Sequence, residues 1–94
     1  MPEFRRGDAN ASGDVDIADA IFMLSHLFAH GPAPTCEDSG DANDDGELNI
    51  ADAVKILAHL FASAGPLPEP FGSCGIDPTN DELGCTSFSP CEGP

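Results

Sequence analysis

Two twelve-residue segments of this chain repeat the same spacing of acidic and amide side chains around a glycine. Residues 8–19 read DANASGDVDIAD, and residues 41–52 read DANDDGELNIAD. In both segments an oxygen-bearing side chain stands at positions 1, 3, 5, 9 and 12, and glycine stands at position 6. The similarity extends over residues 7–31 and 40–64, which are identical at 14 of 25 positions. The chain therefore contains an internal repeat.

This spacing is typical of the calcium-binding loop of EF-hands, where positions 1, 3, 5, 7, 9 and 12 supply oxygen ligands. Ca²⁺ takes about six to eight oxygen ligands, and the glycine at position 6 permits a sharp turn. The predicted ligands of a first ion are Asp8, Asn10, Ser12, the Asp14 carbonyl, Asp16 and Asp19. Those of a second ion are Asp41, Asn43, Asp45, the Glu47 carbonyl, Asn49 and Asp52. We therefore predict two calcium ions per chain, with position 9 acting in each loop through a water molecule.

Solvated turns rich in Asp, Asn and Gly are the alternative interpretation of these segments. They would explain one such segment more readily than two in register, each followed by the pattern of an amphipathic helix. The apolar stripe of the first helix is Ala20, Ile21, Leu24, Leu27 and Phe28, and that of the second is Ala53, Val54, Leu57, Leu60 and Phe61. A single stripe cannot be buried alone, so we expect the two helices to pack face to face.

The ends of the predicted helices are marked by the pairs Gly31-Pro32 and Gly65-Pro66. No helix is predicted before either loop, because residues 1–7 are too few and residues 32–39 contain two prolines. Three apolar residues fall off the stripes and are either additional core, which we favour, or an exposed contact patch: Phe22, Met23 and Ile56.

Residues 65–94 form a tail rich in Pro, Gly and Cys, which we expect to pack on the repeat unit at 7–64. One helical turn is predicted over 77–83, with Asp77 as its N-cap. The four cysteines of this small chain predict two disulfides and an oxidising compartment. Because the turn would bring its flanking cysteines together, we favour Cys74–Cys85 with Cys36–Cys91. The pairing Cys36–Cys74 with Cys85–Cys91 stays open.

The formal net charge of -14 makes nucleic acid and anionic membrane surfaces poor partners. The sequence has no apolar run long enough to insert in a membrane. No catalytic constellation is present, so we do not expect an enzyme. Two histidines at i and i+4 can bind zinc, but no third ligand is nearby, and we interpret the three histidines as surface or flanking residues of open role: His26, His30 and His59.

The segments GDANASGDVDIADAIFMLSHLF and GDANDDGELNIADAVKILAHLF resemble the duplicated calcium-loop–helix units of type I dockerin domains. The resemblance covers residues 7–64. It implies a small all-α fold of two antiparallel helices, each preceded by an EF-hand-like calcium loop, here with a disulfide-stapled irregular tail. The Cys-containing extension looks like that of dockerin-like repeats in large exported bacterial proteins. A resemblance to dockerins also implies a cohesin-like or other cell-surface partner and an extracellular location.

The chain departs from cellulosomal dockerins at loop positions 10 and 11. Those proteins often carry Ser or Thr there for contact with cohesin, whereas this chain has Ile17-Ala18 and Ile50-Ala51. Cohesin specificity is therefore not carried over.

Two functions follow from these patterns. The first is a calcium-dependent module that attaches its parent protein to a partner. The second is a structural cap or anchor, stabilised by calcium and disulfides, without a dedicated partner. A calcium sensor ranks third, because an exterior with steady calcium leaves little for a switch to report. An exposed apolar face would favour the binding module, and a wholly polar surface would favour the cap.

Overall fold

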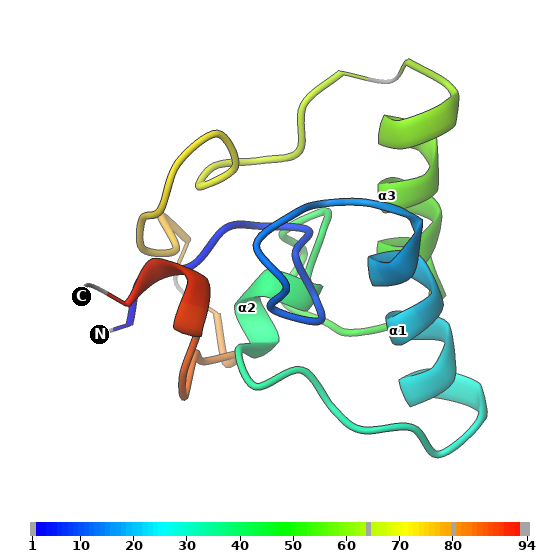
Figure 1. The fold of residues 1–94 in the computed structure, drawn as a ribbon, viewed down its shortest axis with the longest axis horizontal. Helices are drawn as coiled ribbons and strands as arrows, with labels where there is room; N and C mark the ends of the chain where they lie inside the picture. Colours follow the sequence, from blue (N-terminus) through cyan, green and yellow to red (C-terminus); the bar gives the residue numbers. More distant parts are fainter. Residues whose placement is uncertain (1, 64, 80, 93–94) are drawn as a thin grey trace.

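The structure is a computed structural model that describes residues 2–63, 65–79 and 81–92 of the 94-residue chain. It contains the helices α1 (Ile17–Phe28), α2 (Glu37–Gly40) and α3 (Ile50–Phe61), and a 3₁₀ turn η1 (Ser89–Cys91). Two isolated β-bridges are present, and these ranges contain no β-strand. Helices α1 and α3 pack side by side at one end of the molecule, and η1 lies at the other (Figure 1). The predicted small helical fold is confirmed.

Helices α1 and α3 begin with the same pair of hydrogen bonds. The Asp16 side chain accepts from the Ala18 N–H at 3.1 Å, and the Asp19 side chain accepts from the Asp16 N–H at 2.8 Å. Asn49 and Asp52 repeat this pair on α3 at 3.0 and 2.9 Å. Such a capping box satisfies N–H groups that the first turn of a helix cannot pair internally. Positions 9 and 12 of each twelve-residue segment therefore define where the following helix starts.

Both helices end before the Gly-Pro pairs that were predicted to stop them. α1 ends at Phe28 and α3 at Phe61. After α1, His30 adopts a left-handed φ of 57°, and the Gly31 N–H donates to the Ser25 carbonyl at 2.9 Å. The equivalent residue of the second repeat has a φ of 50°. A left-handed residue that precedes the Gly-Pro pair thus redirects the chain after each helix.

The main core lies between the two long helices, the repeated loops and the tail. Its buried apolar residues are Ala9, Ala20, Met23, Ala42, Ala53, Ile56 and Leu67. Met23 and Ile56 are fully buried, and Phe22 packs against the core from a partly buried position, so these off-stripe residues are core as favoured. None of the described helices is long and apolar enough to cross a membrane.

The predicted apolar stripes were wrong in part, because the buried face of each long helix is rotated. Ile21 and Val54, assigned to the stripes, are 54% and 55% exposed, and Phe28 and Phe61 are 68% and 70% exposed. The physical reason is that the helices share their core with residues from outside them: Met23 and Ile56 lie in one buried cluster with Ala9 and Ala42 of the loops and Leu67 of the tail. The helices consequently bury a face toward the loops and tail and leave another apolar face uncovered.

A short helix occupies part of the linker for which none was predicted. α2 follows Cys36, and the Ser39 hydroxyl donates to the Cys36 carbonyl at 2.7 Å to close its turn. The prolines of the linker lie before this turn, where they remove no hydrogen bond from it. α2 therefore leads directly into the second loop.

The two disulfides are Cys36–Cys85 and Cys74–Cys91, so the predicted number is confirmed and the predicted pairing is wrong. The favoured pairing Cys36–Cys91 with Cys74–Cys85 and its rival Cys36–Cys74 with Cys85–Cys91 are both replaced. The expected turn at 77–83 is not helical at residues 77–79 and 81–83, and Asn80 lies outside the described residues. The described residues of this segment therefore do not form the helical turn that was expected to bring Cys74 close to Cys85.

The tail instead runs beside the α2 segment. The Asp38 N–H donates to the Gly84 carbonyl at 3.1 Å, and the Thr86 N–H donates to the Thr35 carbonyl at 3.2 Å. This antiparallel pairing places Cys85 opposite Cys36. Two disulfides are typical of proteins that fold in an oxidising, non-cytoplasmic environment.

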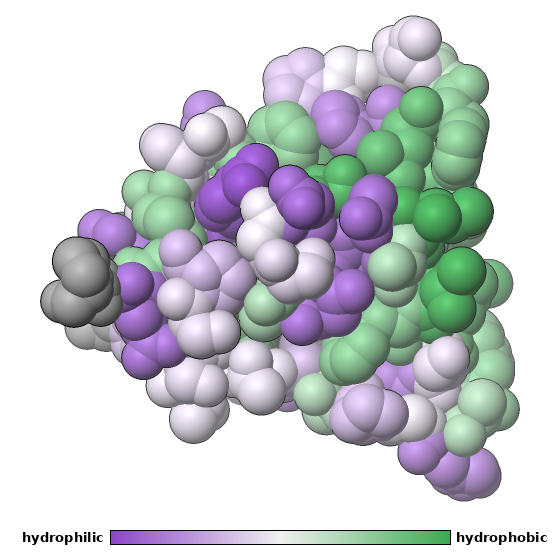
Figure 2. Space-filling model, in the orientation of Figure 1, coloured by the Kyte–Doolittle hydropathy of each residue, from purple (hydrophilic) through white to green (hydrophobic). Residues whose placement is uncertain are grey.

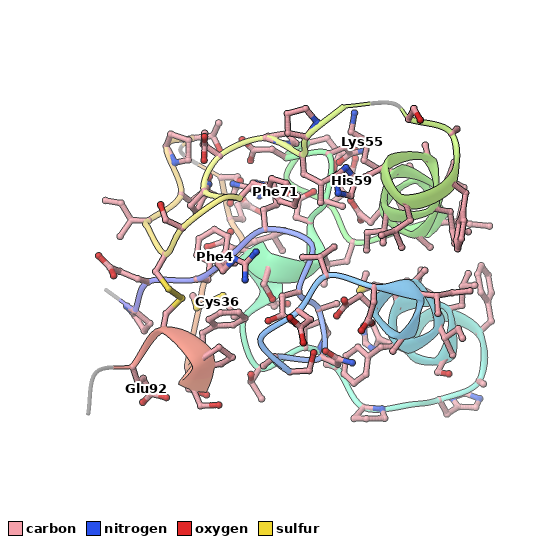
Figure 3. The ribbon with its side chains drawn as sticks, turned by 45° about the horizontal axis from the view of Figure 1, so that its top comes forward. Phe4, Cys36, Lys55, His59, Phe71 and Glu92 are labelled. Atoms are coloured by element: carbon pink, nitrogen blue, oxygen red, sulfur yellow. A yellow bond between two sulfur atoms is a disulfide. The ribbon has the colours of Figure 1, made fainter. Side chains whose placement is uncertain are left out.

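A fully buried arginine joins the N-terminal segment, the second repeat and the tail. The Arg6 guanidinium donates to the carbonyls of Pro68, Glu69, Asp38 and Asp41 at 2.9 to 3.3 Å. It also lies 5.3 Å from the centre of the Phe4 ring. Phe4 packs with Cys36 and Phe88 in a second, smaller core. Phe4 and Cys36 are labelled in Figure 3.

Candidate metal centres

The two repeated loops have the same backbone conformation at the positions that turn most sharply. Position 4 is left-handed in both, with φ of 56° at Ala11 and 57° at Asp44. Position 6 is also left-handed, with φ of 99° at Gly13 and 84° at Gly46. Only glycine adopts this second conformation without strain, which gives a reason for its presence at position 6 in both loops.

The carboxylate at position 1 is buried and fixed by the backbone of its own loop. Asp8 accepts from the Ser12 N–H at 3.0 Å and from the Gly13 N–H at 2.9 Å. Asp41 accepts from the equivalent N–H groups at 3.2 and 2.9 Å. Both aspartates have no exposed surface. The loop thus wraps around its first carboxylate and holds it in one orientation.

The carboxylate at position 12 joins the beginning of each loop to its end. Asp19 is fully buried and accepts from the Asn10 N–H at 3.2 Å with one oxygen. Its other oxygen makes the capping-box bond to Asp16 described above. Asp52 repeats both contacts in the second loop, at 3.5 and 2.9 Å. Helix initiation and the orientation of this candidate ligand therefore depend on the same hydrogen bond.

In the second loop, three of the predicted ligands are brought together. Carboxylate oxygens of Asp41, Asp45 and Asp52 lie within 4.8 Å of one another. Burial raises the pKa of Asp41 to about 7, and the nearby Asp52 charge adds to this increase. Burial also raises the pKa of Asp52. Such buried and crowded carboxylates need a compensating positive charge to stay ionised, and a hard divalent cation is one group that could supply it.

The first loop has the same arrangement with one charge fewer at position 5. Burial raises the pKa of Asp19 to about 7, and the charges of Asp8 and Asp16 contribute. Ser12 stands where the second loop has Asp45, and its hydroxyl donates to the Asp14 carbonyl at 3.3 Å. Ser12 is thus a neutral oxygen close to one of the predicted carbonyl ligands.

The remaining predicted ligands have other partners in this structure. The oxygens of Asn10 and Asn43, at position 3, accept from the N–H of position 5 at 3.1 and 3.2 Å. At position 7 the Glu47 N–H donates to Asp45 at 3.0 Å, a bond that does not involve the Glu47 carbonyl, which is the predicted ligand. Asp16 and Asn49, at position 9, are helix N-caps. This capping role was missed from the sequence, although the Asp and Asn three residues before a carboxylate are its signature.

A third acidic group, which sequence reasoning missed, lies between α2 and the tail. Carboxylate oxygens of Asp38, Asp77 and Asp81 lie within 4.8 Å of one another. Burial, followed by the charge of Asp77, raises the pKa of Asp38 to about 7, and burial also raises that of Asp81. Burial opposes ionisation of Asp77 too, but hydrogen bonds from Thr79 and the Arg6 charge lower its pKa. No local signal predicts this group, because Asp38 is far in the sequence from Asp77 and Asp81.

One of the three histidines has a defined structural contact. The His59 Nδ1 lies 2.7 Å from the Gly65 carbonyl oxygen, and the ring meets Phe71 edge-to-face with 4.9 Å between centroids (Figure 3). His59 therefore holds the start of the tail against α3. The sequence had left its role open.

No family model, curated protein or solved structure matches this chain significantly. The functional conclusion accordingly depends on the repeated loops and on the exposed surface of the two helices that follow them.

Proposed function

We propose that this chain is an exported, non-catalytic, dockerin-like module that binds two calcium ions and attaches its parent protein to a cohesin-like or other surface partner. In this proposal α1 and α3 are antiparallel helices related by an approximate twofold axis, each following an EF-hand-like loop. The equivalence of the two loops, hydrogen bond by hydrogen bond, supports a shared ligand-binding role. The buried acidic groups of each loop support a divalent cation.

The observation that carries the docking proposal is an exposed apolar face that both repeats provide. We call apolar face the set Ile17, Ile21 and Phe28 of α1 with Ile50, Val54 and Phe61 of α3, each at least half exposed. Positions 1, 5 and 12 of a helix fall within about 40° of one another around its axis, so each trio forms one strip. Figure 2 shows hydrophobic residues gathered on the side of α1 and α3.

The apolar face favours a docking module over a structural cap. A cap without a partner has no use for six exposed large apolar residues on adjacent helices, since such a patch promotes aggregation. Both repeats contribute equally to the apolar face, because large apolar residues stand at equivalent positions of α1 and α3. The calcium loops start both helices and would therefore hold the two strips in register.

The docking proposal predicts calcium-dependent capture that needs the apolar face. The immobilised chain should retain a partner from a surface-protein fraction of the source cells in calcium and release it in chelator. The variant Ile21→Asp/Val54→Asp should reduce retention at least tenfold, because charges would enter a desolvated contact. Ile76→Asp is the matched control, since Ile76 is 60% exposed but lies in the tail.

Retention that survives Ile21→Asp/Val54→Asp, or that Ile76→Asp abolishes equally, would contradict docking through this face. An absence of any calcium-dependent partner would favour the structural cap. Circular dichroism of each variant in calcium verifies that the helices are intact.

The two calcium sites should differ in affinity, the second being tighter. Asp41, Asp45 and Asp52 give the second loop three direct carboxylates, whereas Ser12 leaves the first loop with two. Ser12→Asp should therefore strengthen the weaker site, on the order of tenfold, because affinity rises with ligand charge. Isothermal titration calorimetry measures both steps. A weaker first site in this variant, or one ion in total for the unmodified chain, would contradict the assignment.

A further inference from the structure

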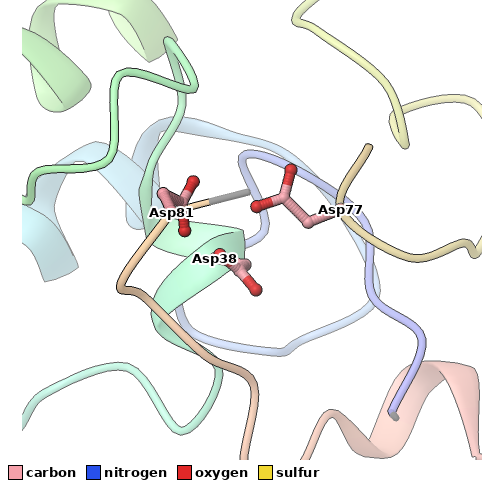
Figure 4. Close-up of side chains that lie close together, drawn as sticks. All are labelled: Asp38, Asp77 and Asp81. Carbon is pink, nitrogen blue, oxygen red and sulfur yellow. The ribbon is translucent and has the colours of Figure 1, made fainter. Parts of the chain in front are cut away.

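We infer that Asp38, Asp77 and Asp81 form an additional divalent-cation site, separate from the two repeated loops and built between α2 and the tail. We call these three residues the tail site. Figure 4 shows the three side chains close together, with Asp38 on α2 and Asp77 and Asp81 on the adjacent tail. Carboxylate oxygens of all three lie within 4.8 Å of one another.

Asp38 provides the evidence that this group lacks a partner. Asp38 is buried, with only 2% of the residue exposed. Its Oδ1 is buried and has no hydrogen-bond partner within the described part of the chain. A buried carboxylate oxygen without a donor costs free energy that a folded protein normally avoids. A cation held jointly with Asp77 and Asp81 would satisfy it.

Among the described residues near the tail site, the buried cation is Arg6, and it forms an ion pair with only one of the three carboxylates. Arg6 donates to Asp77 Oδ1 at 3.0 Å and lies 3.6 Å from Asp44. Its contact with Asp38 is to the backbone carbonyl, at 3.3 Å, and not to the carboxylate. Three ionised carboxylates against one guanidinium leave at least two negative charges uncompensated. One divalent cation balances that excess.

The donor atoms of the tail site favour a hard divalent cation such as Ca²⁺. All three side chains offer carboxylate oxygen, and neither histidine nor cysteine joins the group. The Thr79 hydroxyl, 2.8 Å from Asp77 Oδ1 and 3.2 Å from Asp81 Oδ2, adds a neutral oxygen at the edge. The hydrogen bonds that Asp77 accepts fall on Oδ1, so Oδ2 is the oxygen that can turn to the ion.

A cation at the tail site would join the tail to α2 beside the Cys36–Cys85 disulfide. Asp81 lies close to the second loop as well, because its carboxylate also groups with Asp41 and Asp44. The tail site and the second loop are therefore neighbours, and the experiment must separate them.

Native mass spectrometry of the oxidised chain, with free Ca²⁺ as the only added ligand, counts the ions. The unmodified chain should bind one ion more than Asp38→Asn and one more than Asp81→Asn. Glu82→Gln is the control, since it removes the same charge from an exposed neighbour and should keep the full count. Asp52→Asn removes a loop ion, so the double variant Asp38→Asn/Asp52→Asn should lose two.

The tail site is overturned if Asp38→Asn and Asp81→Asn both bind as many ions as the unmodified chain, or if the double variant loses no more than Asp52→Asn alone. Should Asp38→Asn fail to fold by circular dichroism, Asp81→Asn, which alters a more exposed residue, decides the question. Loss of an ion in Asp38→Asn without loss in Asp19→Asn or Asp52→Asn would retain the tail site and reject calcium binding by the loops.

Discussion

Removal of calcium from the oxidised protein at neutral pH is expected to abolish most of its helical circular dichroism. Each long helix starts at a hydrogen bond made by a buried candidate ligand, Asp19 or Asp52, so the loss of the ion disturbs helix initiation directly. A metal that binds only the folded state stabilises it by about 4 kcal/mol at a thousandfold excess over its Kd. This is comparable with the whole stability of a small domain.

The metal-free protein should recover helix as the pH is lowered from about 7 toward 4. Burial raises the folded-state pKa of Asp19 and Asp41 to about 7, above the 3.8 of an unperturbed aspartate. The folded state therefore binds more protons than the unfolded state in this window, and stability rises as the pH falls. With calcium at the proposed sites the dependence should reverse, because protons would compete with the ion for the same carboxylates.

Circular dichroism in chelator and in calcium, across this pH range, checks both expectations. Magnesium at equal concentration is a suitable control, since it favours a smaller octahedral site. A helical signal that chelator leaves unchanged at pH 7, with both disulfides intact, would refute the dependence. The reduced protein should lose helix at a lower chelator concentration than the oxidised protein.

Arg6→Met is expected to destabilise the calcium-loaded protein by about 3–5 kcal/mol, the usual cost of removing one partner from a buried ion pair. Methionine retains part of the apolar volume but leaves Asp77 and the four carbonyls around the guanidinium without their donor. These groups come from α2, the second loop and the tail, so the junction between them should loosen first.

Urea denaturation in saturating calcium measures the effect. Arg5→Met is the matched control, because Arg5 is partly buried and donates to the Phe71 and Gly13 carbonyls at 3.0 Å each. Its loss should cost roughly 1–2 kcal/mol. Equal effects of the two variants would contradict the role of Arg6 as the buried junction.

The sequence was sufficient for features that adjacent residues decide. The repeat spacing identified the two loops and the helices after them, since loop turns and helix starts depend on contacts within a few residues, such as Gly13 with Asp8 and Asp16 with Asp19. The cysteine count predicted two disulfides for a similar reason, because small chains that contain several cysteines generally oxidise all of them. Whether the loops bind calcium stays a prediction.

Tertiary structure alone decided which helix face is buried, which cysteines pair and where the third acidic group lies. Met23 and Ile56 belong to one core cluster with Ala9 and Ala42 of the loops and Leu67 of the tail, and helical periodicity carries no information about such distant partners. Cys36 meets Cys85 because the tail pairs with the α2 segment, and the same approach brings Asp81 to Asp38. Each of these contacts depends on how a long connection closes, which the local preferences of its residues do not specify.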